Sequence, residues 1–398
     1  MAVSAACLMS SYEFVRNTSN TLVKVEYGLT SLALIYAIMP LGVLALLFIY
    51  NKLLSYFGPQ KTITISIIGS SLVILLCYFL HTMGIKASVV ALMIFREAYI
   101  VLIVEQMWSF ISSIVTLRKA KVFYSIVLSI STLGSVLGGW GVYYLAESLG
   151  TSTLLTVAAL GLFPTALLAH LAYSNSTCIK TENKSQKTST NNNLGASLFI
   201  KQPVLTGTLI IVITSQVYST LVELAFQSSL HINIPDADAQ TSASGLFFGY
   251  LSLTALLGQV FVAPLMLSKL PLYVIHFCIP GIHFMALIFL LIRDDLYSAG
   301  LVFILFKSLD YSVFRAAKEI LYLPLSFDAR FRTKSLIDVF GYRASKGATS
   351  IGLSLFQFKQ GVLPVSFLGK MGSLALIIWV VTVGPTLKYW RKAYDNKD

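Results

Sequence analysis

Five ionisable side chains fall within one apolar segment, residues 297–325. They are Lys307, Asp310, Arg315, Lys318 and Glu319. Ionisable groups at membrane depth are costly, so they usually serve function. On an α-helix, successive residues are about 100° apart around the axis. Three cations of this segment and one neighbouring tyrosine therefore fall within roughly 80° of one another. This cationic stripe consists of Lys307, Tyr311, Arg315 and Lys318. Cations grouped in this way indicate a binding site for an anion.

The composition is that of an all-α polytopic membrane protein. The chain of 398 residues is 56% hydrophobic and 12% charged, whereas soluble domains are about one quarter charged. Several apolar segments are long enough to cross about 30 Å of hydrocarbon. These are residues 28–50, 62–81, 87–117, 122–146, 151–173, 203–229, 243–267, 272–292, 296–323, 335–360 and 365–387. Residues 1–14 are too short to span at about 1.5 Å per residue, so we expect eleven full transmembrane helices after a truncated first helix.

Lysine and arginine accumulate in one set of alternate loops, and the positive-inside rule places those loops in the cytoplasm. The C-terminal segment carries four of these cations, namely Lys388, Arg391, Lys392 and Lys397. We therefore expect a cytoplasmic C-terminus. The same rule accounts for most of the net charge of +12, so no nucleic-acid partner is expected.

A polar stretch without periodicity divides the chain into two nearly equal parts. We expect an N-terminal transmembrane bundle (1–173), a cytoplasmic linker (174–202), a C-terminal transmembrane bundle (203–390) and a cytoplasmic tail (391–398). Weak internal symmetry supports a duplication, because FREAY from Phe95 and FRAAKE from Phe314 each precede a basic loop. The pattern predicts a major-facilitator-like arrangement of two six-helix bundles, with a substrate site near the midplane.

Charged side chains at membrane depth concentrate in matching helices of the two halves. We expect one group to bind substrate phosphates, using arginine for bidentate contact. That group contains Lys318, Arg315, Lys307, Arg96, Arg343, Lys346 and Tyr311. A second group is expected to pair with these cations or act as gates, and it contains Glu97, Glu223, Glu319, Asp310 and Asp338. The alternatives are packing roles: Arg96 and Glu97 are adjacent and are not expected to pair with each other, and Arg343 and Lys346 could snorkel.

Soluble catalytic motifs are absent from the sequence. There is no GxxxxGK[ST] phosphate loop, GxSxG, HExxH or CxxC, so we expect neither an enzyme nor an ATP-driven pump. The four cysteines are scattered and the five histidines do not cluster with them. No metal site and no cofactor are expected.

The block from Lys318, KEILYLPLSFDARFRTKSLIDVFGYRASKGATSIG, resembles the KEMxYIPL and IDVxGxRxGKxG signatures of the non-mitochondrial ADP/ATP translocases. These are TLC-type nucleotide transporters of plastids and obligate intracellular bacteria. Further matches cover nearly the whole chain. They are NTLV from Asn20, Glu97 itself, W-x-F from Trp108, KAKVFY from Lys119 and LVELAFQ from Leu221.

The resemblance implies twelve helices and exchange of nucleotides without hydrolysis. It also implies transport roles for Glu97, Glu223 and Lys318, and a bacterial inner membrane as the location. One motif departs from the family. Where the family reads R-D-T-K-D-T-L, this chain has RNTSNTL from Arg16, so that Ser19 replaces lysine and Asn20 replaces aspartate. We expect these two residues in the first external loop.

The main hypothesis is therefore a nucleotide antiporter, monomeric by default, in which the Lys/Arg-lined cavity holds the phosphates during alternating access. One alternative is a proton-coupled transporter of another anionic metabolite, with Glu105 as the coupling acid. Another is a non-transporting remnant left by loss of the first helix. The partners expected under the main hypothesis are a phosphate-bearing anion and the lipid bilayer.

Overall fold

The computed structural model describes residues 1–114, 117–175, 202–324, 337, 341–361 and 363–395, and these residues form helices without a β-strand. Nine helices of this part are long and apolar enough to cross a membrane. The predicted all-α polytopic fold is thereby confirmed. Contacts divide the chain into two compact units, Met1–Gln186 with Ile234–Leu253 and Lys187–Asn233 with Thr254–Asp398. Division of the chain by a linker at 174–202 stays a prediction, since most of the linker lies outside the described residues.

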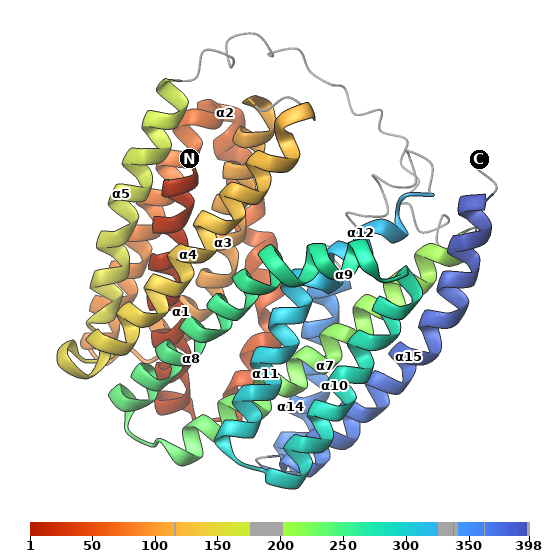
Figure 1. The fold of residues 1–398 in the computed structure, drawn as a ribbon. Coiled ribbons are helices and arrows are strands. Elements are labelled where there is room, and N and C mark those ends of the chain that lie inside the picture. Colours follow the sequence, from red (N-terminus) through yellow and green to blue (C-terminus); the bar gives the residue numbers. More distant parts are fainter. Residues whose placement is uncertain (115–116, 176–201, 325–336, 338–340, 362, 396–398) are drawn as a thin grey trace. The chain divides into compact units, whose positions relative to one another are not determined.

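The first unit is built around its first helix. Its helices are α1 (Ala2–Tyr27), α2 (Ser31–Thr82), α3 (Ala87–Ile114), α4 (Leu117–Leu149), α5 (Leu154–Ser174) and the first part of α8 (Ala237–Leu257). Figure 1 shows α1, in red, running among α3, α4 and α5, and α1 packs against all three.

The expectation of a truncated first helix was wrong. α1 has 26 residues, which gives a length of about 39 Å at about 1.5 Å per residue. It was missed because the second half carries a polar run, and that run is buried from Asn17 to Thr21. A helix inside a bundle finds hydrogen-bond partners on its neighbours, so it does not need the apolar surface that lipid requires. Ser19 and Asn20 therefore lie on a buried helix and not in an external loop.

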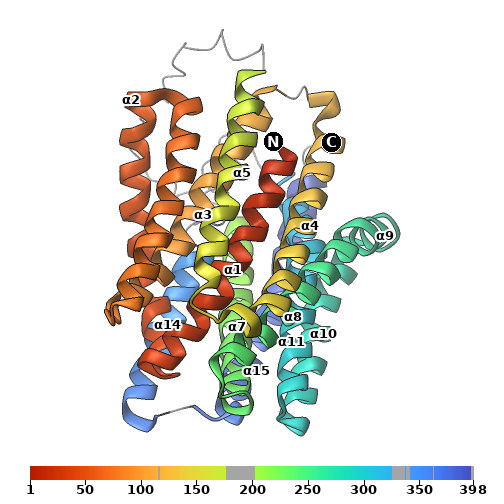
Figure 2. The same cartoon turned by 90° about the vertical axis from the view of Figure 1, so that its left-hand side faces the viewer.

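Two of the predicted segments form one hairpin-like element, α2. Non-helical torsions at Gly58 (φ 71°, ψ 171°) interrupt the helix, and Pro59 follows. A positive φ favours glycine, and the residue before proline is disfavoured in the α region. Figure 2 shows the two arms of α2 side by side, joined at this turn. The predicted segments 28–50 and 62–81 are these two arms.

Within the first unit, α4 and α8 cross at glycine. A Cβ atom added to Gly139 would lie 2.6 Å from the Gly249 nitrogen and 2.7 Å from its Cα. Around this crossing, the Thr151 nitrogen and hydroxyl each donate to Asp238 Oδ1 at 2.6 Å. The Ser242 hydroxyl donates to the Tyr143 carbonyl at 2.9 Å. Small residues allow the backbones to approach, and hydrogen bonds between the helices then fix their register.

We predict that Gly139→Ala lowers the melting temperature of the purified protein in detergent. The new methyl group meets backbone rather than a movable side chain, and such overpacking costs about 1–3 kcal/mol. The matched control is Gly69→Ala in α2, where an added Cβ meets no atom within 4 Å. An equal effect of the two substitutions would contradict the close crossing.

The second unit repeats the packing pattern of the first. Its elements are α7 (Pro203–Asn233), the end of α8, a π-helical turn η2 (Gly258–Val262), α9 (Ala263–Lys269), α10 (Leu272–Arg293), α11 (Leu296–Leu309), a π-helical turn η3 (Asp310–Phe314), α12 (Arg315–Leu321), α14 (Tyr342–Gln360) and α15 (Val365–Asp395). Here α7 packs against α11, α14 and α15, which occupy the same places in this half of the sequence as α3, α4 and α5 do in the other. This correspondence agrees with the predicted duplication.

The turn between α10 and α11 is set by two aspartates. Asp294 adopts a left-handed conformation with φ 42°, and Asp295 forms a capping box with Ser298. The Asp295 carboxylate accepts a hydrogen bond from the Ser298 nitrogen at 2.7 Å. This bond favours the ionised form and holds the pKa of that carboxyl below its usual value. The short turn keeps the cation-bearing helix α11 against α10.

Candidate functional site

The guanidinium group of Arg96 joins α3 to α1 inside the first unit. Its Nη1 atom donates to the Arg16 carbonyl at 2.7 Å and to Ser19 Oγ and Asn20 Oδ1, each at 2.8 Å. The Arg96 side chain is 2% exposed. The two residues that depart from the family motif, Ser19 and Asn20, are thus direct partners of Arg96.

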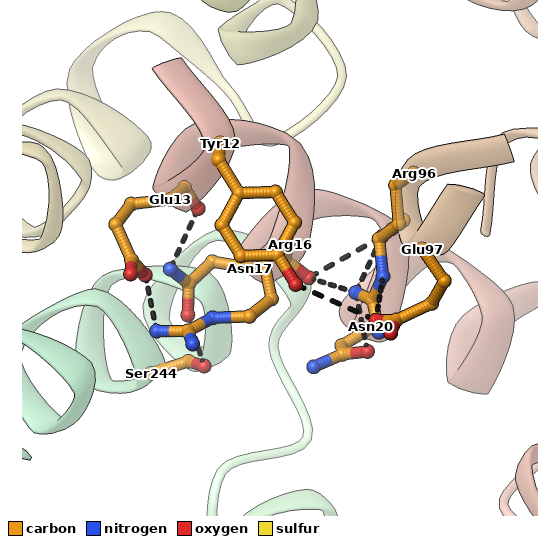
Figure 3. Close-up of polar contacts among 9 residues, drawn as sticks. Tyr12, Glu13, Arg16, Asn17, Asn20, Arg96, Glu97 and Ser244 are labelled. Carbon is orange, nitrogen blue, oxygen red and sulfur yellow. Dashed lines mark hydrogen bonds and ion pairs between the residues drawn. The ribbon is translucent and has the colours of Figure 1, made fainter. Parts of the chain in front are cut away.

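Glu97 lies beside this buried arginine but is more accessible. Its Oε1 atom lies 3.3 Å from Arg96 Nε, and the Glu97 side chain is 30% exposed. The Tyr12 hydroxyl donates to the same oxygen at 3.4 Å, and Figure 3 shows this hydroxyl pointing toward Glu97. The expectation that adjacent Arg96 and Glu97 do not pair was wrong, because two long side chains can bend back along the helix and meet.

A second face of α1 contacts α8 within the same unit. Arg16 pairs with Glu13, and its guanidinium carbon lies 3.6 Å from the centroid of the Phe248 ring. Asn17 donates to the Glu13 carbonyl at 2.8 Å and accepts from the Ser244 hydroxyl at 2.6 Å. Figure 3 shows Glu13, Asn17 and Ser244 on one side of Tyr12 and Arg96 with Glu97 on the other. The polar run of α1 therefore makes side-chain contacts on both faces, although the Thr21 hydroxyl has no hydrogen-bond partner among the described residues.

In the second unit, one tyrosine ring lies close to two cations. Lys307 Nζ lies 5.5 Å from the centroid of the Tyr311 ring, and the Arg315 guanidinium lies 5.3 Å from it. Arg315 is exposed and Lys307 is half-buried. Cations over an aromatic face are stabilised by its quadrupole. The structure therefore brings together three members of the predicted stripe, Lys307, Tyr311 and Arg315.

The environment of Lys318 differs from that of Lys307, Tyr311 and Arg315. It is 3% exposed, its Nζ donates to the Tyr342 hydroxyl at 3.5 Å, and it lies 4.9 Å from the centroid of the Tyr342 ring. A step of three residues turns the side chain by about 60° relative to Arg315. Lys318 therefore faces α14 and is held in a buried position.

Lys346 of α14 pairs with Glu223 of α7. Lys346 Nζ lies 3.1 Å from Glu223 Oε2 and 3.4 Å from Oε1, and the two side chains are 29% and 12% exposed. Both residues were predicted from sequence, in different groups. The structure brings these two together within the second unit.

We predict that Lys346→Met destabilises the protein and that the exchanged pair Glu223→Lys with Lys346→Glu recovers part of the loss. Removal of one partner leaves a mostly buried charge without its counterion, which costs about 1–3 kcal/mol. The readout is the melting temperature in detergent. The control is Arg391→Met, because the Arg391–Asp395 pair is 83% and 67% exposed and an exposed pair contributes about 0–1 kcal/mol. No recovery in the exchanged pair would argue against a direct interaction.

The remaining predicted residues differ in their settings. Asp310 is 4% exposed, and its Oδ1 has no hydrogen-bond partner among the described residues. Glu319 and Arg343 are half-buried, and Glu105 is exposed on α3. Asp338 lies outside the described residues, as does much of the signature block that follows Pro324.

Sequence reasoning missed the polar residues of α1. These are Tyr12, Glu13, Arg16 and Asn17, together with Ser19 and Asn20 as partners of Arg96. One signal could have found them. The spacing of Tyr12, Arg16 and Asn20 is i, i+4, i+8, and Glu13 precedes Arg16 by three residues, so helical faces with compatible charges were visible in the sequence.

The chain was compared with known proteins in sequence and in structure. No protein-family model matches the chain. The structure is similar to a bacterial homologue of the iron transporter ferroportin (TM-score 0.70, 13% identity, 98% of this chain and 97% of that chain). It is also similar to the nucleoside transporter NupG (TM-score 0.65, 12% identity, 99% of both chains) and to the xylose transporter XylE from E. coli (TM-score 0.62, 13% identity, 94% of this chain and 96% of that chain). At these identities the likeness concerns the fold alone.

The described residues form an all-α polytopic membrane fold that is similar to the folds of these solved membrane transporters. In sequence, the chain is similar to two ADP,ATP carrier proteins. It is 23% identical over 315 residues to ADP,ATP carrier protein 1 of Chlamydia trachomatis, covering 67% of this chain and 56% of the relative. It is 24% identical over 306 residues to ADP,ATP carrier protein 1 of Chlamydia muridarum, covering 65% and 55%. The alignments thus span about half the length of these curated relatives.

Proposed function

We propose that the protein exchanges nucleotides across a membrane by alternating access, without hydrolysing them. The observation that carries this proposal is the relationship to two proteins named ADP,ATP carriers. Cations of the second unit supply suitable chemistry for phosphate. Lys307 and Arg315 both lie close to the Tyr311 ring, and Lys318 and Lys346 lie on α12 and α14. Arginine and lysine are the side chains that bind phosphate oxygens.

In this proposal the acidic residues neutralise the cations when no substrate is bound. Glu223 neutralises Lys346 in the structure, and an arriving phosphate would compete for the same ammonium group. Such exchange of partners lets a binding site stay stable when empty and still release its ligand. We extend this role to Glu319, Asp310 and Asp338 as a proposal only.

The proposed setting is a bacterial inner membrane with a cytoplasmic C-terminus and a monomeric protein. The orientation rests on the loop distribution of lysine and arginine. The remnant alternative loses its premise, since the first helix is a helix of 26 residues.

Counter-exchange in proteoliposomes tests the proposed function. Vesicles that contain the purified protein and are preloaded with ADP should take up labelled ATP, and empty vesicles should take up much less. Uptake that ignores preloading and collapses with a protonophore would favour the proton-coupled alternative. In that case Glu105→Gln should abolish the proton dependence, because Glu105 is the acid assigned to coupling. Absence of uptake for a full panel of nucleotides would reject nucleotide exchange.

A further inference from the structure

The most accessible charged group in the polar cluster of the first unit is an acid, Glu97, and the partly accessible cation Arg16 (17% exposed) is paired with Glu13. Arg96 is 2% exposed, whereas Glu97 is 30% exposed. Arg96 Nη1 already donates to the Arg16 carbonyl, Ser19 Oγ and Asn20 Oδ1. Oxygen Oε1 of Glu97 contacts Arg96 and Tyr12, and oxygen Oε2 has no partner among the described residues. The group that remains for a ligand here is therefore a carboxylate oxygen.

Aromatic rings border this carboxylate. Tyr12 lies edge-on to Tyr99 with ring centroids 6.5 Å apart, and Phe95 stacks on Tyr99 at 5.4 Å. Tyr99 is 2% exposed, and its hydroxyl has no hydrogen-bond partner among the described residues. Tyr12 and Phe95 are only partly buried. The cluster thus combines accessible ring surface, a carboxylate acceptor and a buried hydroxyl.

A carboxylate next to the phosphates of a nucleotide would repel them, so this cluster suits the other end of such a molecule. A nucleoside offers a flat base for aromatic contact and several donors, namely the ribose hydroxyls and, in adenine, the exocyclic amine. Carboxylates bind ribose hydroxyls in dinucleotide sites, and aromatic rings stack on bases without sequence preference. Arg96 Nε lies 3.3 Å from Glu97 Oε1 and holds the carboxylate in place.

We propose that Glu97, with the rings of Tyr12 and Phe95, binds the nucleoside end of the substrate by accepting hydrogen bonds from its neutral donors. The inference rests on the proposed nucleotide transport. It assigns recognition of the base and ribose to this cluster of the first unit.

Isothermal titration of the purified full chain with separate ligands tests this assignment. The ligands are ATP, tripolyphosphate, 2′-deoxy-ATP and the triphosphate of purine riboside, which lacks the 6-amine. Glu97→Gln should weaken ATP binding about tenfold, the effect expected for one hydrogen bond to a charged group. Tripolyphosphate binding should change less than about twofold, because that anion has no nucleoside end. Tyr12→Leu should act in the same direction, and Glu147→Gln, at an exposed position of α4, should have no effect.

The analogues identify the donor. If wild-type protein binds 2′-deoxy-ATP more weakly than ATP, the ribose hydroxyl is the donor, and if it binds the purine riboside analogue more weakly, the amine is. Equal affinity for ATP and both analogues overturns the inference. An equal loss of ATP and tripolyphosphate binding in Glu97→Gln, or no loss of either, also overturns it and leaves nucleotide transport intact. Failure of the wild-type protein to bind any of the four ligands rejects the proposed function as well.

Discussion

Uptake of labelled ATP should fall about 100-fold in Lys318→Ala, to the background of vesicles without protein. Lys318 is 3% exposed and rests against Tyr342, so its ammonium group is held in one place and little order is lost when an anion arrives. Charge-assisted hydrogen bonds contribute about 1.5–3 kcal/mol each, and a buried cation that meets phosphate lies at the upper end of that range. The measurement is the initial rate of uptake into ADP-loaded proteoliposomes.

Three controls make the result specific to this ammonium group. Lys318→Arg keeps the charge and should keep part of the activity. Tyr342→Phe removes the hydroxyl that accepts from Lys318 at 3.5 Å but keeps the ring, and should cost little. Lys269→Ala changes an exposed cation at the end of α9 and should be silent. Full uptake by Lys318→Ala would remove Lys318 from the phosphate site.

The apolar helices could be predicted from sequence because lipid imposes one simple requirement on them. Ten of the predicted segments coincide with the nine membrane-crossing helices, with two of them in α2. The segment 335–360 is the exception. It is described as α14 from Tyr342, and α14 is not among those nine helices. Length and hydropathy suffice when a helix faces lipid on much of its surface.

The first helix could not be predicted in that way because its environment is protein. Asn17, Ser19 and Asn20 are buried, yet their polar atoms are paired with Glu13, Ser244 and Arg96. Hydropathy along the sequence measures the cost of placing these groups in lipid and cannot include partners from α3 and α8. The same limit applies to the candidate site. Sequence spacing grouped Lys307, Tyr311 and Arg315 correctly, but burial of Lys318 against α14 depends on tertiary packing.

Arg96→Ala should be among the most destabilising single substitutions in the first unit. The substitution removes the donor shared by the Arg16 carbonyl, Ser19 and Asn20, and it leaves Glu97 without its counterion. Loss of a buried charged donor that leaves its acceptors unpaired costs about 1–3 kcal/mol for each acceptor. We therefore expect a large fall in the melting temperature in detergent and weak expression of the variant.

Arg96→Lys separates the effect of charge from that of the hydrogen-bond fork. Lysine keeps a positive charge, but its single nitrogen cannot replace both Nη1, which contacts Ser19 and Asn20, and Nε, which contacts Glu97. Its melting temperature should lie between those of the wild-type protein and Arg96→Ala. Ser19→Ala and Asn20→Ala should each lower the melting temperature by less, since each removes one acceptor of the Arg96 fork.

The Arg96 variants also decide between two roles of this residue. If Arg96 joins α1 to α3, its loss lowers stability, and the affinity of the remaining folded protein for tripolyphosphate is unchanged. If Arg96 binds substrate phosphate, as the sequence alone suggests, then affinity falls while the melting temperature stays near that of the wild type. The departures at Ser19 and Asn20 favour the first result, because both residues are neutral groups that contact Arg96 directly. A gain of tripolyphosphate affinity in Ser19→Lys would place the anion next to this cluster and contradict the structural role.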